Sequence, residues 1–197
     1  MQSHKHIQTS LTEAQSALTA LLADERSIVE IAKAGALLST CLANKGRVFS
    51  CGNGGSMCDA MHFAEELSGR YRRNRAALAA TSISDPGHLT CVANDFGYDY
   101  VFSRYLEGHG RVGDCLVVLS TSGKSPSIIR ASDVARSLGM KVIGLHGKPG
   151  SPLESHIDVN ICTPAGEFAD RVQELHIKVL HILIELVERQ LFPQNHA

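Results

Sequence analysis

Residues 50–56 of the chain read SCGNGGS, a glycine-rich turn that ends one apolar run and precedes a helical pattern. The preceding residues 47–51 are predicted to form a β-strand, and residues 56–67 are predicted to form an α-helix. A glycine-rich turn in front of a helix lets backbone N–H groups surround an anion at the positive end of the helix. This unit therefore predicts a small phosphorylated substrate.

The same alternation of strands and helices continues to the end of the chain. Strands are predicted at residues 47–51, 79–83, 115–119, 141–145 and, at an edge of the sheet, 157–161. Further helices are predicted at residues 87–93, 98–107, 125–138 and 168–191. Strands that alternate with helices indicate an α/β fold, a doubly wound parallel sheet covered on both faces. Ligands of such sheets bind at the carboxyl ends of the strands.

Two helices are predicted before the first strand. Residues 10–13 (SLTE) resemble a capping box, which predicts that the first helix begins there. The second helix is expected from about residue 27 to about residue 42, with Gly46 as its C-cap. We expect one domain over residues 1–197, with residues 1–45 as an N-terminal helical extension.

Composition excludes several classes of protein. The 197 residues carry a formal net charge of −1, which gives no electrostatic reason to expect nucleic acid or an anionic membrane as a partner. No apolar run approaches the ~18–20 residues of a membrane span, and the polar N-terminal residues lack the apolar core of a secretion signal. The six cysteines contain no CxxC pair. We expect reduced, structural cysteines and a cytoplasmic protein.

A second polar turn, STSGKSPS at residues 120–127, follows another buried strand. Hydroxyl and N–H groups at the start of a helix suit a phosphate, although serine and threonine also favour such positions as simple N-caps. Neither turn matches GxxxxGK[ST] or GxGxxG, so ATP and NAD are disfavoured. Two polar turns after two buried strands favour a phosphorylated ligand.

Two pairs of polar residues lie at helical spacing. His62 and Glu66 are four residues apart and share one helix face, while Gln173 and His181 are eight apart and also lie within reach of one face. Each could instead be a packed histidine or a solvated surface residue. Spacing alone does not tell whether the two helices meet.

The SCGNGGS turn and the following DAMHFAEEL (residues 59–67) closely resemble the phosphoheptose isomerase family of sugar-isomerase (SIS) domain proteins. The resemblance continues through ANDFG (93–97), STSGKS (120–125) and ADRVQELHIK (169–178), in order and over nearly the whole chain. It implies a three-layer α/β/α sandwich with a mostly parallel, flavodoxin-like sheet, the SIS domain, plus N-terminal helices.

The resemblance also implies roles for individual residues. The substrate pocket would be lined by Asn53, Gly54, Gly55, Glu66, Asn94, Asp95 and Gln173. The phosphate would be held by Ser120, Thr121, Ser122 and Ser125. One Zn²⁺ per subunit would be bound by His62, Glu66, Gln173 and His181, and the acid–base pair would be Glu66 and His181.

The implied reaction converts sedoheptulose 7-phosphate into D-glycero-D-manno-heptose 7-phosphate, an early step towards the heptose of bacterial lipopolysaccharide. The resemblance further implies a homotetramer. An alternative is the replication-initiator-associating protein, a tetrameric scaffold of the same fold, which lacks the residues that match Glu66 and His181. A sugar-phosphate-sensing regulator would need a DNA-binding segment, and the N-terminal stretch is too short and not basic enough for one.

Overall fold

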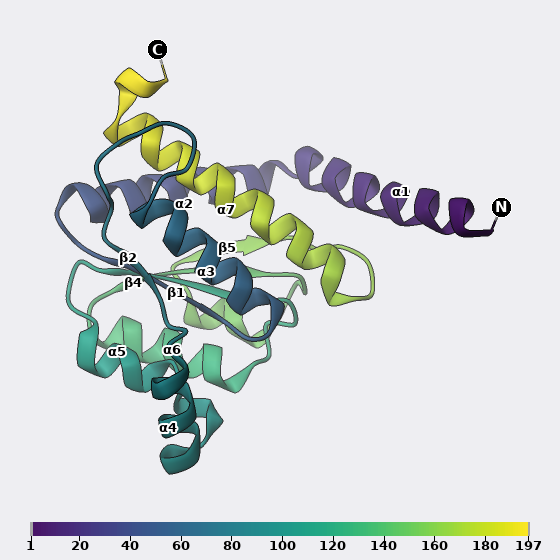
Figure 1. Ribbon diagram of the computed structural model, residues 1–197. Helices are drawn as coiled ribbons and strands as arrows, with labels where there is room; N and C mark the ends of the chain where they lie inside the picture. Colours follow the sequence, from purple (N-terminus) through teal and green to yellow (C-terminus); the bar gives the residue numbers. More distant parts are fainter. Residues whose placement is uncertain (1, 197) are drawn as a thin grey trace.

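Five parallel strands form one twisted sheet in the computed structural model, which describes residues 2–196 (Figure 1). The order across the sheet is β2-β1-β3-β4-β5, the flavodoxin-like order of a doubly wound sheet. The strands are β1 (Val48–Gly52), β2 (Ala80–Ser82), β3 (Cys115–Ser120), β4 (Lys141–His146) and β5 (Val159–Cys162). The predicted α/β fold is confirmed, and β5 lies at an edge as its alternating pattern predicted.

Helices cover both faces of the sheet and enclose two separate cores. One face carries α2 (Glu25–Ala43), α3 (Gly55–Ser68) and α7 (Ala169–Leu191), and the other carries α4 (Pro86–Phe96), α5 (Ser103–His109) and α6 (Pro126–Ser137). Successive side chains of a strand point to opposite faces. In β3, Val117 packs in the first core and Leu116 in the second, both fully buried. This double burial explains why the central strands are continuous apolar runs.

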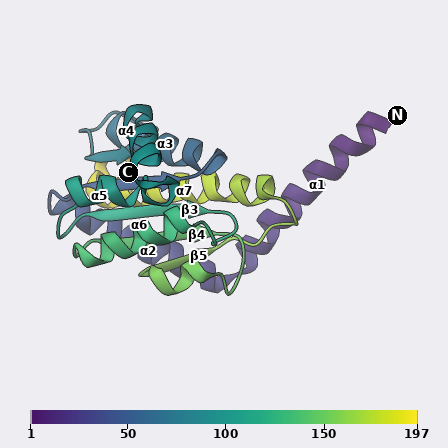
Figure 2. The ribbon, with the colours of Figure 1, turned by 90° about the horizontal axis from the view of Figure 1, so that it is seen from below.

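Helix α1 (Gln2–Ala23) projects away from the rest of the molecule (Figures 1 and 2). It begins well before Ser10, so the predicted capping box at residues 10–13 is wrong. Residues 2–9 contain no glycine or proline, and the Thr9 hydroxyl donates to the Lys5 carbonyl (2.9 Å), a bond that serine and threonine form inside helices. The Ser10 hydroxyl does not cap the helix. Its Oγ accepts a hydrogen bond from Arg171 Nη2 (2.7 Å).

Two further details differ from the sequence-based expectation. The predicted helix at residues 98–107 is broken into a short 3₁₀ turn, η1 (Tyr98–Tyr100), and α5. Helix α2 ends at the cap residue Asn44 rather than at Gly46, and the positive φ (63°) belongs to Lys45. Glycine at position 46 instead lets the backbone lie close to Gly113, since a Cβ there would lie 2.6 Å from the Gly113 carbonyl oxygen.

Within the described part of the chain, no helix is both long and apolar enough to cross a membrane. All six cysteines are free thiols, and three of them are buried. Burial raises the pKa of the Cys51 thiol far above its usual value, which keeps it protonated and unreactive. Two more 3₁₀ turns were not predicted from sequence patterns: η2 (Pro152–His156), between β4 and β5, and η3 (Pro193–Asn195), after α7.

Candidate active site

The two polar turns lie side by side where the order of the strands reverses. Strands β1 and β3 are neighbours, and their carboxyl ends carry the two turns. Asn53, after β1, donates from Nδ2 to Ser127 Oγ (3.1 Å) at the start of α6. Asn53 Oδ1 also accepts from the Tyr98 hydroxyl (2.9 Å). One side chain thus ties both turns together at the place where doubly wound sheets bind ligands.

The glycine turn brings α3 and α7 close together at their N-terminal ends. Gly54 has a φ of +57°, in the left-handed region that glycine favours, and Gly55 is the first residue of α3. A Cβ on Gly55 would lie 2.7 Å from both polar atoms of the Gln173 amide. Gly55 is therefore what allows the Gln173 side chain to lie against the turn.

The serine turn combines hydroxyl groups with the start of a long helix. Ser120 ends β3 and Ser125 is the cap residue of α6, and their hydroxyls lie 3.4 Å apart. Gly123 turns the chain with a φ of +62° and donates to the Ser120 carbonyl (3.0 Å). Ser122 Oγ accepts from the Lys124 amide (3.2 Å). Thr121 lies between these residues, so the four predicted phosphate-binding residues share one turn at a helix N-terminus.

Helices α3 and α7 also meet further along, where they bring a carboxylate between two imidazoles. Glu66 Oε1 lies 3.3 Å from His62 Nε2, and Glu66 Oε2 lies 3.4 Å from His181 Nε2. The two imidazole rings are 5.1 Å apart between centroids. One ligand atom from each of these three residues lies within 4.8 Å of the others. Spacing alone left open whether the two helices meet. They do, and three of the four proposed metal ligands lie together.

The surroundings of Glu66 fit a metal ion. Its carboxylate is largely buried, and among the described residues Oε2 has no hydrogen-bond partner. An orphaned, buried carboxylate oxygen that faces a histidine is where a cation would be stabilised. Two imidazoles and a carboxylate are donors that Zn²⁺ accepts in open, catalytic sites. Gln173 lies two turns earlier on α7, about 12 Å along the helix axis, so its part in a metal site stays a prediction.

Two tyrosines at the site carried no signal in the sequence. The Tyr71 ring stacks on His181, with centroids 5.7 Å apart and planes inclined by 22°. Its partial burial raises the pKa of the Tyr71 hydroxyl, which therefore stays protonated. Tyr71 lies in the irregular segment after α3 and Tyr98 lies in η1. Neither segment has a periodic pattern from which a contact could be predicted.

Asn94 and Asp95 lie on α4, which packs on the opposite face of the sheet from α3 and α7. Both side chains are exposed. In the described part of the chain, Asn94 Nδ2 donates to Asp95 Oδ1 (2.7 Å) and the Cys91 thiol lies 3.6 Å from Asp95 Oδ2. The structure thus places these two residues apart from the carboxylate–imidazole cluster, and their role in the pocket stays a prediction.

The arrangement suits proton transfer on a phosphorylated, oxygen-rich ligand. A carboxylate and an imidazole that face each other can take a proton from carbon and move protons between oxygens. The polar turns at the carboxyl edge can hold an anionic group at the N-terminus of α6.

Comparison with known proteins places the chain in a defined class. The model of the SIS domain family matches residues 11–147, which include both polar turns and helix α3. Phosphoheptose isomerase of Aeromonas hydrophila subsp. hydrophila is 57% identical over 185 residues, which cover 94% of this chain and 96% of the relative. That of Yersinia pestis (strain Pestoides F) is 54% identical over 95% of this chain and 97% of the relative.

Solved structures agree with this placement. The phosphoheptose isomerase of Francisella tularensis superposes with a TM-score of 0.87 at 30% identity, over 96% of this chain and 100% of that one. The enzyme of Neisseria gonorrhoeae gives a TM-score of 0.79 at 36% identity, over 95% and 97%. The fold and the site define a SIS-domain enzyme. Within that class, the chain belongs to the phosphoheptose isomerase family and is a sugar-phosphate isomerase.

Proposed function

We propose that this enzyme converts sedoheptulose 7-phosphate into D-glycero-D-manno-heptose 7-phosphate, an early step of ADP/GDP-heptose and lipopolysaccharide core biosynthesis in the bacterial cytoplasm. The observation that carries the proposal is the Glu66 carboxylate between His62 and His181. The relatives named phosphoheptose isomerase at 54% and 57% identity support the choice of substrate. The residues alone support a phosphorylated sugar or polyol.

The reaction moves one proton between neighbouring carbons through an enediol. Glu66 takes a proton from C-1 of the open-chain ketose, the electrons of that C–H bond form the C-1=C-2 double bond, and His181 protonates the former carbonyl oxygen. In the second half Glu66 returns its proton to C-2 while His181 takes the proton of the C-1 hydroxyl, which becomes the aldehyde. Atoms and charges balance, and both residues end in their starting states.

Substrate binding in this proposal uses the two turns at the carboxyl edge. Ser120, Thr121, Ser122 and Ser125 hold the phosphate at the N-terminus of α6. The Asn53-Gly54-Gly55 turn lets the sugar lie close to the backbone, with Gln173, Asn94 and Asp95 as further pocket residues. Glu66 lies eleven residues after Gly55 on α3, about 16 Å along the helix axis, so a turn and a carboxylate from different subunits of the proposed tetramer would meet at one substrate.

We also propose one Zn²⁺ per subunit, held by His62, Glu66 and His181 with Gln173 as a fourth ligand. The orphaned Oε2 atom of Glu66 supports this assignment. A bound Zn²⁺ would act as a Lewis acid on the oxygens of the substrate. Glu66 is a stronger base when it is free than when it is ligated, so chelator is expected to change the rate.

A homotetramer is the proposed assembly, with residues 1–45 as an extension of the single domain formed by residues 1–197. Helix α1 buries only Leu21 and exposes an apolar stripe of Ile7, Leu11, Leu18 and Leu22. Between α1 and residues 164–171 lies an open groove of about 840 Å³. A second copy of the chain that packs against α1 would cover this apolar surface.

An assay of the purified protein on sedoheptulose 7-phosphate, with and without chelator, tests the proposed function. We expect formation of the aldose 7-phosphate, and no turnover of sedoheptulose that lacks the phosphate, because the serine turn then has no anion to hold. If no aldose forms under any metal condition, the proposal fails and the scaffold alternative is favoured.

A further inference from the structure

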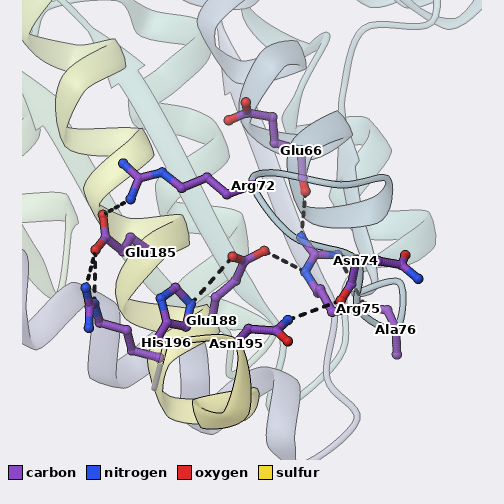
Figure 3. A network of polar contacts seen from close by, with 10 residues as sticks. Glu66, Arg72, Asn74, Arg75, Ala76, Glu185, Glu188, Asn195 and His196 are labelled. Carbon is purple, nitrogen blue, oxygen red and sulfur yellow. Dashed lines mark hydrogen bonds and ion pairs between the residues drawn. The ribbon is translucent and has the colours of Figure 1, made fainter.

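A buried arginine binds the C-terminal end of the helix that carries Glu66. Arg75 lies in the segment after α3, and its side chain is 0% exposed. Its Nη2 donates to the Glu66 carbonyl oxygen (2.6 Å) (Figure 3). Its Nη1 donates to the Leu67 carbonyl oxygen (2.7 Å). These carbonyls belong to the last turn of α3, where no partner exists inside the helix. The guanidinium therefore caps the negative end of α3 at the backbone of Glu66 itself.

The same guanidinium is bound to α7. Arg75 Nε donates to Glu188 Oε1 (2.8 Å), and the Glu188 side chain is also 0% exposed. Glu188 follows His181 by seven residues, or two helical turns, so both side chains lie on the same face of α7. Arg75 thus links the backbone of Glu66 to the helix that carries His181.

The C-terminal segment closes over this ion pair. His196 Nε2 lies 3.8 Å from Glu188 Oε2, and Asn195 Nδ2 donates to the Asn74 carbonyl (3.1 Å) (Figure 3). His196 therefore lies against the Glu188 end of the pair, and Asn195 holds the segment that carries Arg75. Exclusion of water strengthens the attraction between Arg75 and Glu188.

Stability alone does not account for this arrangement, because a buried ion pair contributes little more to stability than apolar residues of similar volume. Building on the proposed function, we propose that Arg75 and Glu188 are positioning residues. They set the register of α3 against α7, and with it the distance between the Glu66 carboxylate and the His181 imidazole. Neither residue touches the reacting atoms. Their effect is exerted through the Glu66 backbone and through α7.

The double variant Arg75→Met/Glu188→Met separates positioning from stability. It removes both charges and keeps similar volumes, but the Glu66 and Leu67 carbonyls lose their donor. We therefore expect a lower urea midpoint than in the wild type, but a higher one than in either single variant, which leaves one buried charge unpaired. Misplacement of a catalytic group by about 1 Å costs about 100-fold in rate. We expect kcat of the folded double variant to fall by about that factor, with KM changed by less than about threefold, because the phosphate-binding turn is untouched.

Arg47→Met provides the matched control. Arg47 pairs with Asp114 (3.2 Å) at the amino ends of β1 and β3, the opposite edge of the sheet from the polar turns. This variant is expected to lower the urea midpoint and to leave kcat unchanged. A stable double variant with wild-type kcat would overturn the positioning role, because the pair would then serve stability only.

A double variant that does not fold and a wild type without activity each call for a second measurement. If the double variant does not fold, Arg75→Lys is used, since an ammonium group cannot reach Glu188 and both α3 carbonyls at once. Reduced kcat in that variant supports the proposal, and wild-type kcat overturns it.

If the wild type itself has no isomerase activity, the proposed function has failed. A crystal structure of the double variant then tests the register directly, and an unchanged Glu66–His181 distance would overturn the positioning role.

Discussion

Glu66 is the residue at which the polar contacts of the site converge. Each of its carboxylate oxygens faces a different histidine, and its own carbonyl is held by Arg75. Contacts at the carboxylate and at the backbone of Glu66 thereby orient its side chain. A base that is held in this way needs little reorganisation during proton transfer.

Gly55→Ala tests the role of Gln173, whose side-chain amide lies against the glycine turn. The added methyl group would lie 2.7 Å from the Gln173 amide and would displace this flexible side chain. We expect kcat/KM to fall by about 10-fold or more, while the free energy of unfolding changes by less than about 1 kcal/mol, because alanine favours a helix. Steady-state kinetics and urea unfolding measure the two effects.

Gly108→Ala is the matched control, because Gly108 also lies in a helix and a methyl group there meets no atom within 4 Å. It is expected to leave kcat/KM unchanged. If Gly55→Ala behaves in the same way, Gln173 takes no part in the reaction.

Local spacing in the sequence predicted two of the three residues of this cluster. His62 and Glu66 lie four residues apart on one helix, and that spacing alone places them on a common face. His181 joins them only because α3 packs against α7, more than 100 residues later, and helix packing is not encoded in local periodicity. Arg75 lies in an irregular segment, and nothing in its neighbours predicts a buried guanidinium.

Helix α7 was predicted from its apolar pattern, and it carries one histidine that is buried without a hydrogen-bond partner among the described residues. The helix was expected at residues 168–191 and runs over Ala169–Leu191. Its apolar face packs on the sheet and includes His176, which is fully buried, with neither ring nitrogen hydrogen-bonded among the described residues. Burial lowers the pKa of His176 to about 4, so the native protein keeps this imidazole neutral.

This burial predicts a loss of stability in acid. In the unfolded chain His176 takes up a proton below about pH 6.5, whereas in the native state it does so only near pH 4. The unfolded state therefore binds more protons in this window, and the contribution is complete above pH 6.5 and decreases as the pH falls. Between about pH 7.5 and 5.0 we expect a loss of about 2 kcal/mol from this group, measured by urea unfolding.

His176→Leu removes the titrating group and keeps the site apolar. Other groups titrate equally in both proteins, so the variant should lose about 2 kcal/mol less than the wild type over the same range. Identical pH dependence in the two proteins would show that His176 does not titrate differently on unfolding.

The whole molecule is a covered parallel sheet from which one helix stands out (Figure 2). The two helical layers and the edge position of β5 follow from strand and helix patterns that were predictable, whereas the flavodoxin-like order of the sheet was implied by the family resemblance. The start of α1 was not predictable, because Thr9 and Thr12 bond within the helix and Ser10 accepts from Arg171 instead of capping it. The exposed stripe on α1 has no partner within the described part of the chain, which is why we propose a second copy there.

Leu11→Glu/Leu18→Glu tests this assembly. Two charges in the apolar stripe would be buried without a partner in an interface, so we expect the mass measured by light scattering to fall below that of a tetramer. Thr19→Glu adds a charge outside the stripe on the same helix and should leave the mass unchanged. A double variant that remains a tetramer would show that α1 does not form the interface.

Proton transfer by Glu66 and His181 is tested by the turnover of Glu66→Gln and His181→Gln on sedoheptulose 7-phosphate, with folding checked by circular dichroism. Each substitution keeps the approximate size of the side chain and removes its ability to accept and return a proton. We predict that both variants fold and that each loses at least about 100-fold in kcat. Wild-type turnover in either folded variant would contradict the assignment of proton transfer to this pair.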